Sequence, residues 1–288
     1  MSDDNNDLFK YAPSVAAAGT SSALFALTTG LHMWQAYIGR TWYFSPFIVG
    51  GWFQVVGYAF RAVSATEYPN QPLPPYIVQY LGLLLAPSLY AASIYMVLGR
   101  IIRLTNAHAF TLVKAQWITK IFVAGDVVSF LMQMGGGGVL ASSKTESGQD
   151  LGELLITIGL IVQLIFFGFF IVVSINFHYR LRSNPTDASR KTSFSWEIYL
   201  YILYIGSILI MVRSIFRVIE YVQGQDGPLL SKEWYLYVFD TALMFLTMVL
   251  FNVKHPSIIL LKHTSAKSEA DTESGSNTFL MKPIRISG

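Results

Sequence analysis

The sequence predicts an all-α membrane protein: a bundle of seven transmembrane helices with its N-terminus outside the cell and its C-terminus in the cytoplasm. Three observations lead to this prediction. Hydrophobic residues make up 53% of the chain and charged residues only 13%, whereas a soluble domain carries about 25% charged residues. The hydrophobic residues are gathered into blocks of roughly 20, the length that a helix needs to cross a bilayer core. Lys and Arg fall mostly into alternate connections between these blocks.

The blocks define the domain organisation. The spans divide the chain into an extracellular segment (1–12), a transmembrane domain (13–257) and a cytoplasmic tail (258–288). The tail is rich in Ser, Thr, Glu and Gly, so we expect it to be disordered. In chain order, we place the seven membrane-spanning helices at Pro13–Tyr37, Tyr43–Ser64, Tyr76–Leu98, Ile118–Ala141, Glu153–Phe177, Trp196–Glu220 and Trp234–Val253.

Each of the first three hydrophobic blocks has a sequence feature that helps to define the helix. The segment before the first block is acidic and polar and lacks the basic region of a cleavable signal peptide, so we expect the first helix to remain in the mature protein. The second block begins beside Trp42, an aromatic residue of the kind that lies at the membrane–water interface. The third block contains no charged residue, and Pro87 in its middle predicts a kink.

The last four blocks also have recognisable ends. The fourth closes with Gly135–Gly138, which we interpret as a close helix contact or a flexible helix exit. A phosphate-binding loop would need a preceding strand and a following Lys, and neither is present. The fifth block is uncharged from Leu154 to Phe177. The sixth and seventh begin at Trp196 and Trp234, as interfacial aromatic residues do.

The basic residues predict the orientation. Loops 1, 3 and 5 together with the tail carry 14 of the 20 Lys and Arg, the opposite side carries 3, and the remaining 3 lie within or at the edges of spans. Cytoplasmic loops are enriched in Lys and Arg, so we expect the C-terminus in the cytoplasm. An odd number of helices then places the N-terminus outside.

Several functional classes lack the residues that they need. The chain has no cysteine, which excludes disulfides and cysteine metal sites. It has no G-x-x-x-x-G-K-[ST] loop and no HExxH motif, and no Ser/His/Asp arrangement is evident. The histidines lie near span ends or in loops, where they do not form a mid-membrane haem site. We therefore expect no enzyme activity, no cofactor, no metal and no nucleic-acid partner.

A charge network is predicted near the outer ends of the helices. Arg213, Arg217 and Glu220 follow helical spacing and share one face of the sixth span. Asp240 lies at a similar depth in the seventh span, and Arg61 lies near the outer end of the second. Charged groups within a bilayer are costly, so we expect ion pairs that join these three helices. The alternative is that the three arginines extend outward as interface anchors.

A polar seam is predicted around Asp126, about 9 Å inside the cytoplasmic boundary. Gln133 lies on the same helix face, and Gln54 and Gln163 lie deep in other spans. If these side chains face one another, they form a path for a lipid head group in which Asp126 receives a cationic amine. A hydrogen-bonded structural aspartate is the alternative. Asp240 lies at a depth that differs by about 12 Å, so we do not expect the two aspartates to share a site.

A series of short motifs recurs along the chain in a fixed order. They are Tyr11-Ala12-Pro13-Ser14; Gly57-Tyr58 and Arg61; Ala86-Pro87, Ala91-Ala92, Tyr95 and Gly99-Arg100-Ile101-Ile102; Asp126, Ser129, Gln133 and the glycine run 135–138; Gly159-Leu160 and Gln163; Arg213-Ser214, Phe216-Arg217, Glu220, Gly224, Gly227, Glu233, Tyr237 and Asp240; and His255-Pro256. Taken together, these motifs resemble the fungal lipid-translocating exporter family, the RTA-type proteins linked to 7-aminocholesterol resistance and sphingoid-base release. The resemblance covers roughly residues 11–261. One departure is Gln54, which stands where such proteins often have Glu.

The resemblance implies a plasma-membrane protein of fungal origin that moves amphipathic lipids such as sphingoid long-chain bases and confers resistance to toxic lipids or drugs. A second function remains open: a seven-helix receptor or sensor that regulates lipid traffic through cytoplasmic partners bound at the basic loops 3 and 5. The lipid, the direction and energy source of its movement, and the oligomeric state do not follow from the sequence.

Overall fold

The computed structural model describes residues 11, 13–67, 73–143, 145–191, 195–223, 229 and 232–257. Within these ranges every regular element is helical, which confirms the all-α prediction. The tail and nearly all of the N-terminal segment lie outside the described residues.

Each predicted block is helical. Two short 3₁₀ helices, η1 and η2, and the short α6 lie in connections, and η3 is a π-helical segment between α8 and α9. The elements are α1 (Val15–Ile38), η1 (Trp42–Phe44), α2 (Ser45–Thr66), α3 (Leu73–Leu104), η2 (His108–Phe110), α4 (Ala115–Ser142), α5 (Glu146–Ser183), α6 (Asp187–Lys191), α7 (Trp196–Val222), α8 (Trp234–Leu236), η3 (Tyr237–Ala242) and α9 (Leu243–Val253).

Five helices in the described ranges are long and apolar enough to cross a membrane: α3, α4, α5, α7 and the continuous helix Trp234–Val253. The protein is therefore a multi-pass membrane protein. Helices α1 and α2 have 24 and 22 residues, about 36 and 33 Å at 1.5 Å per residue. They are more polar because Ser, Thr and Gly recur in α1 and because α2 carries Gln54 and Arg61. That all seven cross the membrane remains a prediction.

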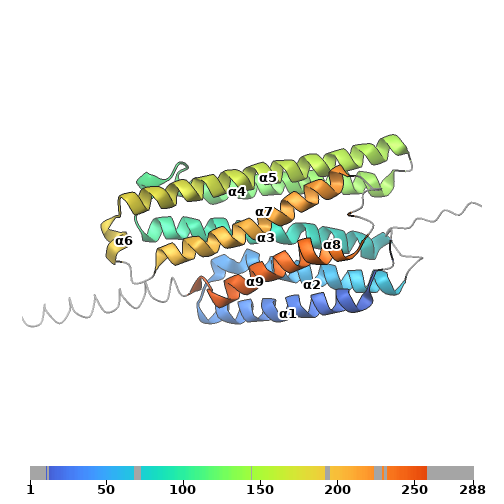
Figure 1. Ribbon diagram of the computed structural model, residues 1–288, viewed down its shortest axis with the longest axis horizontal. Coiled ribbons are helices and arrows are strands. Elements are labelled where there is room, and N and C mark those ends of the chain that lie inside the picture. Colours follow the sequence, from blue (N-terminus) through green and yellow to red (C-terminus); the bar gives the residue numbers. More distant parts are fainter. Residues whose placement is uncertain are drawn as a thin grey trace, which may run out of the picture.

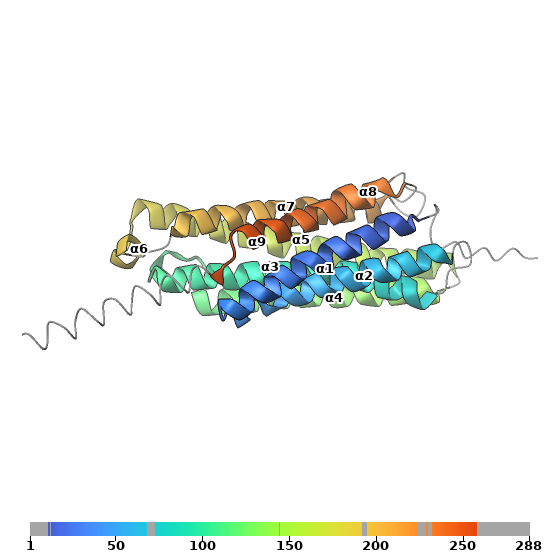
Figure 2. The ribbon, with the colours of Figure 1, turned by 90° about the horizontal axis from the view of Figure 1, so that it is seen from below.

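The long helices run along a common axis, and α3 and α7 lie between two groups of helices (Figures 1 and 2). On one side lie α4 and α5, and on the other lie α1, α2 and α9. Helix α3 contacts α2, α4 and α7, while α7 also contacts α5 and α9. Helices α3 and α7 therefore both join the two groups.

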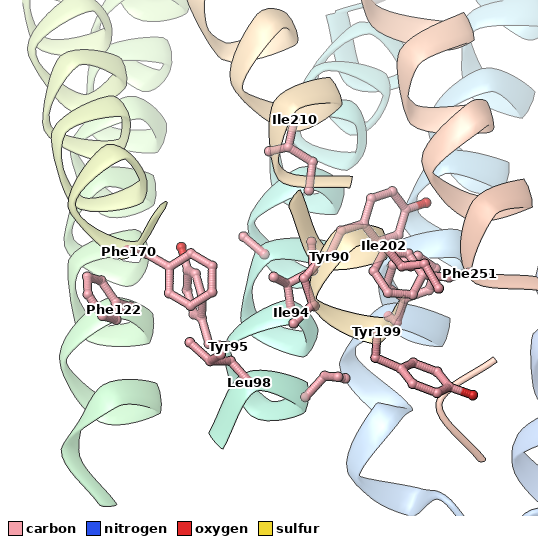
Figure 3. Packing of buried hydrophobic residues seen from close by; sticks show 14 of the residues in the cluster. Tyr90, Ile94, Tyr95, Leu98, Phe122, Phe170, Tyr199, Ile202, Ile210 and Phe251 are labelled. Carbon is pink, nitrogen blue, oxygen red and sulfur yellow. The ribbon is translucent and has the colours of Figure 1, made fainter. Parts of the chain in front are cut away.

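Aromatic side chains fill the core on both sides of α3 (Figure 3). The ring of Tyr95 lies 5.4 Å from that of Phe122 in α4 and 4.5 Å from that of Phe170 in α5. On the other side, Phe47 of α2 packs against Tyr90 at 4.5 Å between ring centroids. Offset and edge-to-face rings contribute beyond the area they bury, so these clusters stabilise α3 against both groups.

The glycine run makes one close helix contact. A Cβ atom at Gly136 would lie 2.7 Å from the Gly152 carbonyl oxygen and 2.8 Å from the Ile156 main-chain nitrogen, both in α5. A Cβ at Gly135 or Gly138 would meet nothing within 4 Å. Of the two interpretations of the run, close packing therefore applies at Gly136, where a small residue lets two backbones approach.

Candidate functional site

A buried ion-pair cluster joins α7 to the helix Trp234–Val253. The Asp240 carboxylate accepts a hydrogen bond from Arg213 Nε at 2.9 Å and another from Arg217 Nη2 at 2.5 Å. Arg217 Nη1 also donates to Glu220 Oε2 at 2.8 Å. Asp240 is fully buried and Arg213 is 1% exposed. The four residues that the sequence grouped by depth and helical face thus contact one another.

The arginines do not extend outward as interface anchors. Arg61, Arg213 and Arg217 are all buried within the bundle. Each is held there by a carboxylate, and pairing offsets much of the cost of removing a charge from water.

Arg61 and Glu233 form a second cluster beside this one, and the predicted network did not include Glu233. The Arg61 Nη2 group lies 3.0 Å from Glu233 Oε1 and donates to the Tyr11 hydroxyl at 2.8 Å. The Tyr237 hydroxyl also donates to Glu233, and the main-chain N–H of Ser14 bonds to the same carboxylate. Sequence reasoning missed Glu233 as a partner, although it precedes the seventh span directly and lies at the depth of Arg61.

The two clusters together suit helix locking better than binding an anion. Between them, the buried Tyr58 hydroxyl of α2 bonds to Thr241 of η3 at 2.5 Å. Among the residues of these clusters that the structure describes, positive and negative side chains are equal in number. They are Arg61, Arg213 and Arg217 on one side and Glu220, Glu233 and Asp240 on the other.

The π-helical segment η3 carries Asp240 within this cluster. The Thr241 hydroxyl in this segment donates to the Leu236 carbonyl five residues earlier, at 3.4 Å. Segments of this kind are rare and occur often at functional sites. The sequence gives no periodic signal for η3.

A polar seam links α4, α5 and α3. Gln133 Nε2 donates to Gln163 Oε1 at 3.0 Å, and Gln163 Nε2 donates to Ser88 Oγ at 3.1 Å. The predicted facing of Gln133 and Gln163 is therefore present in the structure. Ser88 was not predicted as a member, because a lone serine in an apolar helix gives no distinguishing signal.

Asp126 lies two helical turns from Gln133 on α4, with a side chain only 4% exposed. In the part of the chain that the structure describes, neither of its carboxylate oxygens has a hydrogen-bond partner. The Tyr95 hydroxyl of α3 lies beside the carboxyl group and interacts with it, although the contact falls outside the geometric limits of a hydrogen bond. Asp126 is thus a buried acid with one neighbouring hydroxyl and no basic partner among the described residues, and it stands apart from the Asp240 cluster.

Gln54 does not join the seam, contrary to prediction. Helix α2 contacts α3 through the face of α3 that carries Ala86 and Tyr90, whereas Ser88 faces α5. Helix α3 therefore separates Gln54 from Gln163. Gln54 is fully buried, and its amide has no hydrogen-bond partner among the described residues.

Two histidines meet at the opposite end of the bundle from the charge clusters. The rings of His32 in α1 and His255 after α9 have centroids 5.6 Å apart. His32 Nε2 lies 3.0 Å from the Met248 carbonyl oxygen, and the main-chain N–H of Ser257 donates to His255 Nδ1. These contacts attach the segment that follows α9 to the bundle. No group of three metal-ligating side chains occurs in the described ranges.

Comparisons with known proteins identify similar chains. A family model described as "RTA1 like protein" matches residues 47–263. The "Protoporphyrin uptake protein 1" of Saccharomyces cerevisiae is 41% identical over 73% of this chain and 67% of its own length.

Two relatives have names that refer to lipids. The "Probable lipid transporter atnI" of Emericella nidulans is 31% identical over 88% of this chain and 69% of its own. The "Sphingoid long-chain base transporter RSB1" of Saccharomyces cerevisiae is 23% identical over 88% of this chain and 78% of its own. No solved structure matches the chain.

Proposed function

The chain belongs to the RTA1-like family, and from that premise we propose that it moves amphipathic lipids with a cationic head group across a fungal plasma membrane. Sphingoid long-chain bases are the substrate class that the proposal names, with resistance to toxic lipids as the consequence. The names of two relatives, a probable lipid transporter and a sphingoid long-chain base transporter, support lipid movement. All seven long helices then cross the membrane, with the C-terminus in the cytoplasm.

The observation that carries the proposal is the buried carboxyl group of Asp126, which has no basic partner among the described residues. A buried carboxylate without a positively charged partner is costly in a membrane protein. A ligand ammonium group would supply the missing donors as a charge-assisted pair. Asp240, by contrast, already has two arginine partners and has no need of a cation.

The seam above Asp126 can accept the rest of a polar head group. The Gln133 Oε1 atom has no partner within the described residues, so it can accept a hydrogen bond from a ligand hydroxyl. The amide chain through Gln163 to Ser88 offers exchangeable donors and acceptors farther along. Because Asp126 is almost fully enclosed, the described state is closed, and entry of a head group requires α3 and α4 to separate.

Transport by the purified protein tests this proposal. Liposomes with and without the protein receive a fluorescent sphingoid base, with and without a proton gradient, and transbilayer movement is followed by quenching from one side. We expect movement above that of empty liposomes and little movement of the N-acylated analogue, which has no cationic amine. The Asp126→Asn protein should lose movement of the base, whereas Asp150→Asn, which changes an exposed aspartate, should retain it.

Three results contradict the proposal. Movement of the base by Asp126→Asn at the wild-type rate excludes the carboxylate as the amine site. Movement of protoporphyrin but not of the base assigns the chain to an anionic amphiphile. No movement of any amphiphile by well-folded protein favours the receptor or sensor function, in which cytoplasmic partners bound at loops 3 and 5 carry out the response.

A further inference from the structure

Pro87 leaves one main-chain carbonyl of α3 without its helical donor. Proline has no N–H, so the carbonyl four residues earlier, that of Leu83, cannot receive the usual i to i−4 hydrogen bond. Helix α3 nevertheless continues through Pro87. In this structure Arg213 Nη2 of α7 donates to the Leu83 oxygen at 2.9 Å. An arginine side chain thus replaces the missing main-chain donor.

The same arginine is fixed by a second contact. Its Nε atom donates to the fully buried Asp240 at 2.9 Å. A guanidinium group presents its donors in a rigid fork, so Asp240 orients the side chain and directs Nη2 towards Leu83. Asp240 is in turn held by Arg217. The charge cluster therefore sets the position of a main-chain atom in α3.

The residue after Pro87 belongs to the polar seam. Ser88 accepts a hydrogen bond from Gln163, which accepts one from Gln133. The Leu83 carbonyl is bonded from α7 and the Ser88 hydroxyl from α5, with Pro87 between them along the helix. The polar contacts of Asp240 and Arg213 and those of the seam therefore meet the same stretch of α3 and are connected there by five residues of its main chain.

We propose that Arg213 is a positioning residue for the head-group path: by bonding the Leu83 carbonyl freed by Pro87, it holds Ser88 in register with Gln163. The effect of Arg213 on transport rests on the proposed function, whereas its effect on the position of Ser88 does not depend on any substrate. A proline-containing helix can bend where its hydrogen bond is missing, and Arg213 bridges that point. Release of the bond would let α3 bend and open the seam.

A double-mutant cycle tests the link. Arg213→Lys keeps a positive charge for Asp240 but loses the fork that reaches two acceptors. We expect transport per folded molecule to fall roughly tenfold, as when one hydrogen bond to a charged group is lost. In the Pro87→Ala background residue 87 donates to the Leu83 carbonyl itself, so Arg213→Lys should change transport little. Equal losses in both backgrounds would overturn the proposal.

Pro74→Ala is the matched control for the proline. Pro74 lies in the first turn of α3, where N–H groups have no helical acceptor. Arg213→Lys should therefore reduce transport in the Pro74→Ala background as strongly as in the wild type. Thermal stability of each protein, measured in parallel, separates a general loss of folding from loss of transport per folded molecule.

A substrate-free readout separates this inference from the proposed function. The chain has no cysteine, so Ser88→Cys and Gln163→Cys introduce a single thiol pair for a short bifunctional cross-linker. Arg213→Lys should lower the cross-linking rate several-fold, and Pro87→Ala should abolish that effect. Coupled cross-linking without any lipid movement would refute the proposed function alone. An unchanged cross-linking rate would refute the positioning role alone.

Discussion

Replacing Asp240 by asparagine should destabilise the protein strongly. The substitution preserves side-chain volume, so it creates no cavity, but it removes the charge that pairs with Arg213 and Arg217. Arg217 keeps Glu220 at 2.8 Å, whereas Arg213 keeps only the neutral Leu83 carbonyl among the contacts described above. Breaking a fully buried pair in this way costs about 3–5 kcal/mol.

The assay is thermal unfolding in detergent, followed by tryptophan fluorescence. For a chain of this size a loss of that magnitude lowers Tm on the order of ten degrees. Glu233→Gln is the graded comparison, because its side chain is 18% exposed and Arg61 retains the hydroxyls of Tyr11 and Tyr237. Its effect should be clearly smaller. An Asp240→Asn protein that unfolds at the wild-type temperature would refute the assignment of this cluster as a structural lock.

Two further predictions concern packing and pH. Gly136→Ala should lower the yield of folded protein because its Cβ would meet main-chain atoms of α5 at 2.7 and 2.8 Å. Gly135→Ala should be tolerated because a Cβ there meets open space. Equal yields of the two variants in detergent gel filtration would contradict this prediction. Burial lowers the pKa of His255, which lies beyond α9, to about 4. Between about pH 6.5 and 4 the imidazole of the unfolded chain therefore binds a proton more readily than that of the folded protein, and Tm should fall as the pH is lowered. His255→Asn should flatten that dependence, and an unchanged slope in a pH series of melting curves would show that another group is responsible.

The sequence by itself determined the fold class and the grouping of side chains along each helix. Hydrophobic blocks of membrane-spanning length predict helices wherever they occur, because a backbone within lipid must bond to itself. Helical spacing placed Arg213, Arg217 and Glu220 on one face, and the structure has them in contact with Asp240. It did not determine whether α1 and α2, the more polar helices, cross the membrane.

Only the tertiary structure decided which faces meet. Periodicity relates residues within one helix, but the rotation of each helix against its neighbours depends on packing of the whole bundle. That is why Arg61 pairs with Glu233 rather than with Asp240, and why Gln54 lies on the far side of α3 from Gln163.

Hydrogen bonds from side chains to main-chain carbonyls are the contacts that a sequence predicts least well. Pro87 identifies the Leu83 carbonyl as free, but nothing in the pattern of side chains indicates that Arg213 reaches it. Likewise, the lack of a basic partner for Asp126 within the described residues becomes evident only when every neighbouring helix is in place. The sequence supplied the charged groups, and the packing of α3 against its neighbours decided which of them form ion pairs within the bundle.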